Sequence, residues 1–188
     1  MFKKTENLSF TLVETLVVIV ILGLVLGTVY TVYNLSQKAY QEGEKAAELL
    51  QNGRVVLERI SREIRQAREM VSELSEEEEG ATSTIVFEDG HIGDSYHYIH
   101  YFQDDNLVKR EVIGYYFSGD TEKTLVPWDA LPPEGQSLEV QTLEETRIIG
   151  EYLADFKIWG SKIISTALIL EKQDKTLELR TKIFARNL

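Results

Sequence analysis

The feature that most constrains this chain is an uncharged, largely apolar stretch at residues 15–37, which directly follows a single carboxylate, Glu14. A helix of this length is long enough to cross about 30 Å of hydrocarbon. A charged side chain near such a span is unfavourable, by up to about 3 kcal/mol at the bilayer centre and by less toward the interface. We therefore expect a membrane-anchored chain in which Glu14 has a function.

The residues before the span predict its orientation. Lys3 and Lys4 lie on the short N-terminal side, and the positive-inside rule places that side in the cytoplasm. The span is longer than the apolar region of a typical cleavable secretory signal, and no clear small-x-small cleavage site follows it. We expect a single-pass protein of the cytoplasmic (inner) membrane, with its N-terminus inside and its head outside the cytoplasm.

Composition argues against several classes of function. The chain has 31 acidic and 20 basic residues and a net charge of −11, so no contact with a nucleic-acid backbone is expected. It has no cysteine, which excludes disulfides and thiolate zinc sites. His97 and His100 would point to opposite faces of a strand, which argues against a shared metal site. No nucleophile–base pair or phosphate loop is present, so neither a cofactor nor an enzymatic activity is expected.

Beyond residue 37, apolar side chains continue along one face of a predicted helix. This pattern predicts a helix from Phe10 to about Leu74, and it favours packing of the apolar seam on the chain's own head over a coiled coil with another subunit. Four Arg–Glu pairs at i, i+4 spacing are expected to support the other faces. The seam consists of Leu50, Leu57, Ile64 and Val71, with Ile60, Ala67 and Leu74 between them. The pairs are Arg54–Glu58, Glu58–Arg62, Arg59–Glu63 and Arg65–Glu69.

The remainder of the chain is predicted to form a β-rich head. The four glutamates at 76–79, followed by Gly80, predict a solvated loop that ends the helix. Alternating apolar and aromatic residues then predict strands, with turns at 103–106 and 172–175 and an irregular stretch at 119–137. The predicted strands are 84–88, 95–103, 107–117, 163–171 and 176–185. The expected fold class is α+β: a long N-terminal helix, first transmembrane and then amphipathic, packed on a mostly antiparallel sheet.

Residues 9–14 read SFTLVE, and together with the basic leader and the apolar span they closely resemble the class III signal of type IV pilins and type II secretion pseudopilins. The resemblance implies that prepilin peptidase cuts the chain between Ser9 and Phe10 and methylates Phe10. It also implies that Glu14 corresponds to the family's glutamate at the fifth mature position. The family usually has glycine before the cut, where this chain has Ser9.

Processing of this kind would give Glu14 a partner. Cleavage leaves an ammonium group on Phe10, four residues before Glu14 in the sequence. In a bundle of staggered helices, Glu14 of one subunit can neutralise the ammonium group of its neighbour, and a slipped register leaves both charges unpaired. Glu14 is thus the predicted register residue. Gly23 and Gly27 have the GxxxG spacing that permits close helix packing.

Three further stretches are similar to J-type minor pseudopilins and PilW-type minor pilins: QNGR at 51–54, the helix at 57–67 and the last strand and tail at 177–187. This resemblance implies a minor structural subunit, placed near the tip of a pilus or pseudopilus, whose partners are prepilin peptidase and other pilin or pseudopilin subunits. The predicted segments are a leader (1–9), a transmembrane assembly helix (10–37), an amphipathic helix (38–75) and a head (76–188). The alternative is a single-pass, membrane-anchored extracytoplasmic binding module that does not assemble.

Overall fold

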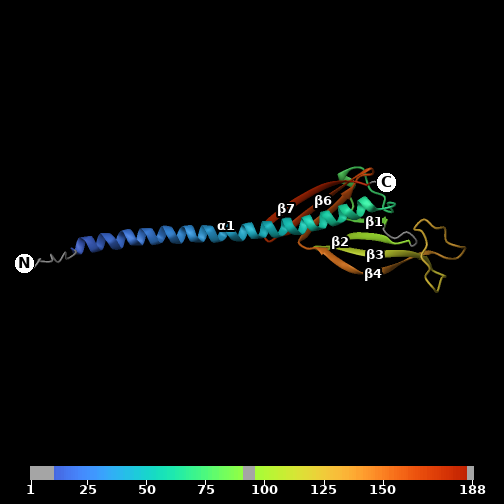
Figure 1. Ribbon diagram of the computed structural model, residues 1–188, viewed down its shortest axis with the longest axis horizontal. Coiled ribbons are helices and arrows are strands. Elements are labelled where there is room, and N and C mark those ends of the chain that lie inside the picture. The colour runs from blue at the N-terminus through green and yellow to red at the C-terminus, as the bar shows by residue number, and fades with distance from the viewer. Residues whose placement is uncertain (1–10, 91–95, 186–188) are drawn as a thin grey trace, which may run out of the picture. The chain divides into compact units, whose positions relative to one another are not determined.

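A computed structural model of the protein describes residues 11–90 and 96–185. The chain forms two compact units, residues 1–44 and residues 45–188. One long helix and seven strands make up most of the described structure (Figure 1). They are α1 (Leu12–Gln66), β1 (Thr84–Glu88), β2 (Tyr98–Asp104), β3 (Leu107–Phe117), β4 (Leu138–Gly150), β5 (Leu153–Trp159), β6 (Ile163–Lys172) and β7 (Lys175–Phe184). A short 3-10 helix, η1 (Glu78–Gly80), precedes β1.

In the first unit, α1 is apolar on all sides between Thr15 and Leu35. Every large apolar side chain from Leu12 to Leu35 is exposed, by 47–83% of its surface. A helix that is hydrophobic all round is normally buried in lipid or in a bundle of other helices. Among the described residues, α1 is also the one helix that is long and apolar enough to cross a membrane.

In the second unit, the end of α1 contributes one stripe to the core. Leu49, Val56, Ile60 and Ile64 are fully buried on this stripe, at intervals of seven, four and four residues, which keep them on one face of the helix. The predicted seam is confirmed at Ile60, Ile64 and Ala67, whereas Leu50 and Leu57 flank the stripe and are only half-buried. A strict seven-residue repeat drifts away from the 3.6-residue period of a straight helix, which explains the offset.

The helix ends at Gln66 rather than near Leu74, because the following residues pair with β1. The amide of Arg68 donates to the carbonyl of Glu88 (3.1 Å), and the amide of Glu88 donates to the carbonyl of Glu69 (2.8 Å). Met70 forms an antiparallel bridge with Phe87. Extended backbone that bonds to a strand edge cannot continue a helix, so Ala67, Val71 and Leu74 of the predicted seam lie outside α1.

Two antiparallel sheets complete the core, with strand orders β1-β2-β3-β4 and β5-β6-β7. Figure 1 shows β6 and β7 on one side of the end of α1, and β1 to β4 on the other. The sheets are joined where β5 approaches β1 and β2: Thr82 forms a bridge with Ile158, and the amide of Phe156 donates to Oε1 of Gln103 (3.0 Å). The apolar core contains side chains from α1 and from both sheets. The expected α+β class is confirmed, and the last part of α1 folds with the head.

The five predicted strands are present, but β4 and β5 were not predicted. β4 is an end strand whose residues are mostly exposed, and it contains the charged run EETR at 144–147. In β5 the register shifts between Leu153 and Asp155, which breaks the alternation of apolar residues. Both features weaken the period-two signal by which strands are found in a sequence.

The acidic run before β1 is less solvated than predicted. Glu76, Glu77 and Glu79 are exposed, as expected. Glu78, however, lies in η1 and accepts two hydrogen bonds from the guanidinium of Arg180, at 2.8 and 2.9 Å. This bidentate pair holds the pKa of Glu78 below its usual value. The 3-10 turn is thereby fastened to β7.

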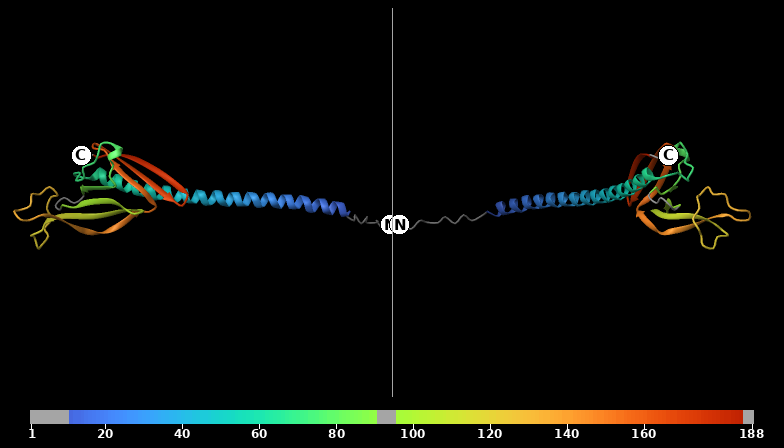
Figure 2. Two further views of the ribbon diagram at one scale, coloured as in Figure 1. Left: turned by 180° about the vertical axis from the view of Figure 1, so that it is seen from behind. Right: turned by 45° about the vertical axis from the view of Figure 1, so that its right-hand side comes forward.

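The irregular segment between β3 and β4 covers part of the outer face of the first sheet. Figure 2 shows this segment projecting beyond the strand ends. Beneath it, Tyr98 is 1% exposed, its hydroxyl accepts a hydrogen bond from the amide of Trp128 (3.0 Å), and its ring packs edge-on against Tyr115 at 5.0 Å. Burial is the main cause that raises the pKa of Tyr98 to about 12.

This burial predicts a loss of stability in alkali. Tyrosine in an unfolded chain ionises near pH 10, so the unfolded state releases its proton first and stability falls as pH rises from about 10 to 12. A shift of two units corresponds to about 3 kcal/mol, most of which is lost by pH 12 and the rest just above it. Urea unfolding of the full chain in detergent at a series of pH values measures this loss, and Tyr98→Phe should show a smaller fall. An equal fall in both proteins would contradict the prediction.

Candidate functional site

The N-terminal end of α1 carries the predicted register residue in a defined geometry. Ser9 and Phe10, the predicted cleavage pair, lie outside the described residues. Oε2 of Glu14 accepts hydrogen bonds from the amide and from the hydroxyl of Thr11, at 2.9 and 3.0 Å. The amide of Glu14 donates in return to Oγ1 of Thr11 at 3.3 Å. These reciprocal bonds form a capping box in which Thr11 is the N-cap and Glu14 is the third helical residue.

The capping box gives Glu14 a second role that our sequence reasoning did not identify. An N-terminal helix end has unsatisfied amide groups and a partial positive charge, which a carboxylate in the first turn stabilises. The pattern Thr-x-x-Glu before an apolar run is a recognised signal for such a cap. Within the described residues, Glu14 is therefore bonded to its own helix, and its carboxylate remains exposed to a second partner.

Gly23 and Gly27 lie on the exposed surface of the apolar part of α1. A Cβ atom added at either position would meet no atom within 4 Å. The hydroxyl of Thr31, one turn after Gly27, donates to the carbonyl of Gly27 at 2.9 Å, so it is satisfied within the helix. This geometry leaves room for a neighbouring helix, and the packing role of the two glycines stays a prediction.

Residues 7–30 match the family model described as the prokaryotic N-terminal methylation motif.

This methylation motif spans the predicted leader end, Ser9, Phe10, the capping box and both glycines. The match supports a type IV pilin-like or pseudopilin substrate of prepilin peptidase. Together with the long apolar helix, it fits a single-pass anchor in the inner membrane. Comparison with curated proteins and with solved structures found no match for the chain.

One histidine and one acidic residue of the head have local partners. His100 lies between Thr84 and Glu111, with Nε2 at 2.8 Å from the threonine hydroxyl and Nδ1 at 2.8 Å from the carboxylate, and its ring stacks on Phe102. Asp104, the last residue of β2, pairs with Lys109. Across residues 11–90 and 96–185, no group of three or more potential metal ligands is found.

A buried polar cluster fixes the end of α1 against the first sheet. Oε2 of Glu63 accepts hydrogen bonds from the hydroxyl of Tyr101 (2.5 Å) and from Nε of Arg110 (3.0 Å). Arg59, one turn earlier on α1, contacts the other carboxylate oxygen at 3.4 Å. Burial, followed by the charge of Glu63, raises the pKa of Tyr101. Burial opposes the charge of Arg110, but the hydrogen bond to Glu63 raises the pKa of the guanidinium.

Proposed function

We propose that the chain is a minor pilin or pseudopilin, a structural subunit that prepilin peptidase trims between Ser9 and Phe10 and methylates on Phe10. The mature subunit then assembles into a type IV pilus or a type II secretion pseudopilus, near its tip. The observation that carries this proposal is the continuity of the methylation motif with a helix that is apolar on every side. A helix of this kind can be stored in a membrane and then transferred into a helical bundle.

In this proposal Glu14 and the Phe10 ammonium of a neighbouring subunit set the register of assembly. The exposed carboxylate of Glu14 supports such a pairing. Only its Oε2 atom takes part in the capping box, and a carboxylate has about four acceptor positions, so it can accept a second donor. Gly23 and Gly27 would allow the neighbouring helix to approach closely. The role is structural, and we propose no catalytic one.

The J-type or PilW-type assignment rests on the similarity of stretches such as QNGR at 51–54. In the structure, Asn52 and Gly53 of this stretch bring α1 against the strands. Oδ1 of Asn52 accepts a hydrogen bond from the amide of Glu151 (3.3 Å), and a Cβ at Gly53 would lie 2.4 Å from Cδ1 of Leu179. A side chain larger than glycine would have to displace Leu179, so the residue types of this stretch serve the helix–sheet contact.

Intact-mass analysis of the chain purified from its native host tests the proposal. The expected mature protein begins at Phe10 and carries one added methyl group. A chain that still begins at Met1, or that is cut well after Phe10, would reject a pilin-like role. A correctly processed chain that is absent from the fibre fraction, and that crosslinks to no other subunit, would instead support the membrane-anchored binding module. A minor subunit should form only a small part of the fibre by quantitative mass spectrometry.

A further inference from the structure

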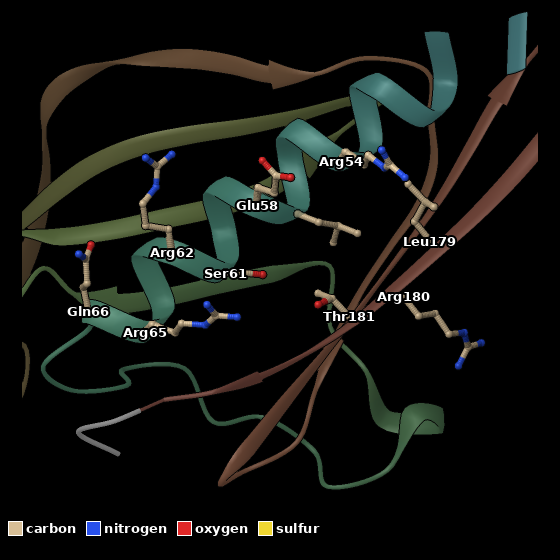
Figure 3. A pocket seen from close by; sticks show the side chains of 10 residues that line it. Arg54, Glu58, Ser61, Arg62, Arg65, Gln66, Leu179, Arg180 and Thr181 are labelled. Carbon is tan, nitrogen blue, oxygen red and sulfur yellow. The ribbon is translucent and has the colours of Figure 1, made fainter. Parts of the chain in front are cut away.

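The second unit contains a groove of about 830 Å³ between the last turns of α1 and the strand β7 (Figure 3). Its size lies in the range of about 300–1,000 Å³ that is typical of binding clefts. Arg54, Arg62 and Arg65 lie along its helix wall, and Leu179 and Thr181 line its strand wall. At one end the helix and the strand are in contact, because Gly53 lies directly against Leu179.

In the described part of the chain, three cations of the helix wall have no ion-pair partner. Of the four Arg–Glu pairs predicted on α1, only Arg59–Glu63 is formed. Arg54, Arg62 and Arg65 take part in no ion pair in residues 11–90 and 96–185. Glu58 is the one carboxylate on this wall. A chain with a net charge of −11 thus presents a locally positive groove.

Two of these arginines are directed toward the strand. In Figure 3, Arg54 and Arg65 extend from α1 toward β7, whereas Arg62 points to the other side. Arg54 and Arg65 are eleven positions apart, which corresponds to about 16 Å along a helix axis. Two residues four positions apart on one face of an extended peptide are about 13 Å apart. The reach of the arginine side chains covers the difference.

The strand wall offers backbone groups as well. β7 is the end strand of its sheet, and it pairs with β6 through a two-residue turn closed by Lys172 and Lys175. In such a hairpin the closing pair is hydrogen-bonded, so every second residue after it directs its amide and carbonyl away from the partner strand. Arg180 is one of these residues, and it lines the groove between Leu179 and Thr181. An end strand with free backbone groups is a template for an added strand.

We propose that this groove binds an extended acidic segment of another polypeptide, which adds as a strand along β7 and places two carboxylates, four residues apart, on Arg54 and Arg65. The inference rests on the proposed function at one point: the acidic segment is taken to belong to a neighbouring subunit of the fibre. The guanidinium of Arg180 does not take part, since Glu78 and Glu178 already hold it.

Binding of short synthetic peptides to the full chain in phosphatidylcholine nanodiscs tests this site. The probe is a capped peptide, TEVTVET, whose two glutamates share one face of a strand, and the matched peptide has glutamine at both positions. We expect the first peptide to bind, and Arg54→Gln and Arg65→Gln each to weaken its binding by about fivefold, as expected for partly exposed ion pairs. Raised salt should weaken it further. Backbone amides of β7 that point away from β6, such as that of Lys182, should gain protection from hydrogen exchange.

The control variant is Arg62→Gln, which removes the same charge from the same helix but from a side chain directed away from β7. Its affinity for the acidic peptide should stay within about twofold, since only a screened long-range contribution is lost. Equal binding of both peptides, or an equal effect of Arg62→Gln and Arg65→Gln, would overturn the proposal. The proposal would also be overturned if anionic lipid vesicles displaced the peptide at low salt and the peptide protected no amide of β7 from hydrogen exchange. Normal peptide binding by a chain that never enters fibres would reject only the proposed function.

Discussion

Replacing Glu14 by glutamine is expected to reduce recovery of the chain in assembled fibres by about tenfold or more, with processing left intact. Glutamine keeps the acceptor oxygen that a capping box needs, so the helix end should survive the change. It removes the negative charge, however, and leaves the ammonium group of a neighbouring Phe10 unpaired at the edge of the apolar layer. An unpaired charge there has an unfavourable free energy of about 1–3 kcal/mol, and about 1.4 kcal/mol is a factor of ten.

The matched control is Thr11→Val, which removes the hydroxyl of the capping box and keeps the charge of Glu14. Loss of an N-cap costs about 1 kcal/mol of helix stability, but it leaves the intersubunit charge pair unaffected. Recovery of this variant in the sheared fibre fraction should stay within about twofold of the unmodified chain. If Thr11→Val is as defective as Glu14→Gln, then Glu14 acts through its own helix end and the register role is wrong.

These two variants separate roles that the sequence alone combined in one residue. The position of Glu14 before an apolar span predicts that the charge needs a partner, and the spacing to Phe10 predicts an intersubunit one. The bonds to Thr11 depend on backbone angles at the helix start, so they became visible only in the structure. The Thr-x-x-Glu capping signal is present in the sequence, at residues that also belong to the stretch resembling a processing signal.

The fold was predictable where one face of an element is buried and the other is not. In β7, Leu177, Leu179, Thr181 and Ile183 alternate with more exposed residues, and the predicted inward face is confirmed. β4 could not be found in the same way, because an end strand exposed on both faces has no reason to alternate. The predicted end of α1 was wrong for a different reason. Apolar residues continue past Gln66 at the same spacing, but there they are buried as extended chain beside β1 and not as helix.

The positive charge of the groove could not be predicted from the sequence, because it depends on which ion pairs fail to form. Spacing at i, i+4 predicts pairs between Arg54, Arg62 or Arg65 and a glutamate, each with a stabilisation of only about 0.5 kcal/mol. So small a gain does not compel an exposed side chain to adopt one geometry. In the described structure, Glu58 forms no ion pair with Arg54 or Arg62. Glu69 lies beyond the end of α1, so it is not positioned for a helical pair with Arg65.

Loss of the Glu63 side chain should destabilise the head strongly, because it accepts hydrogen bonds from both Tyr101 and Arg110. Replacing it by alanine leaves the guanidinium of Arg110, whose side chain is 10% exposed, with one longer contact, at 3.6 Å to Glu144. It also leaves the hydroxyl of the buried Tyr101 without its acceptor. Removing one partner of a buried ion pair costs about 3–5 kcal/mol. We expect a loss of this size in urea unfolding of the full chain in detergent, followed by the fluorescence of the head.

A double replacement distinguishes the charge from the packing. Glu63→Met together with Arg110→Met removes both charges and keeps apolar volume, so it should regain most of the stability that Glu63→Ala loses, because neither charge is then left unpaired. Lys45→Gln, which breaks the exposed pair with Asp174 at 3.2 Å, provides the surface comparison and should cost less than about 1 kcal/mol. A double variant no more stable than Glu63→Ala would mean that the hydrogen bonds of Glu63, and not the unpaired Arg110, hold the end of α1 against the sheet.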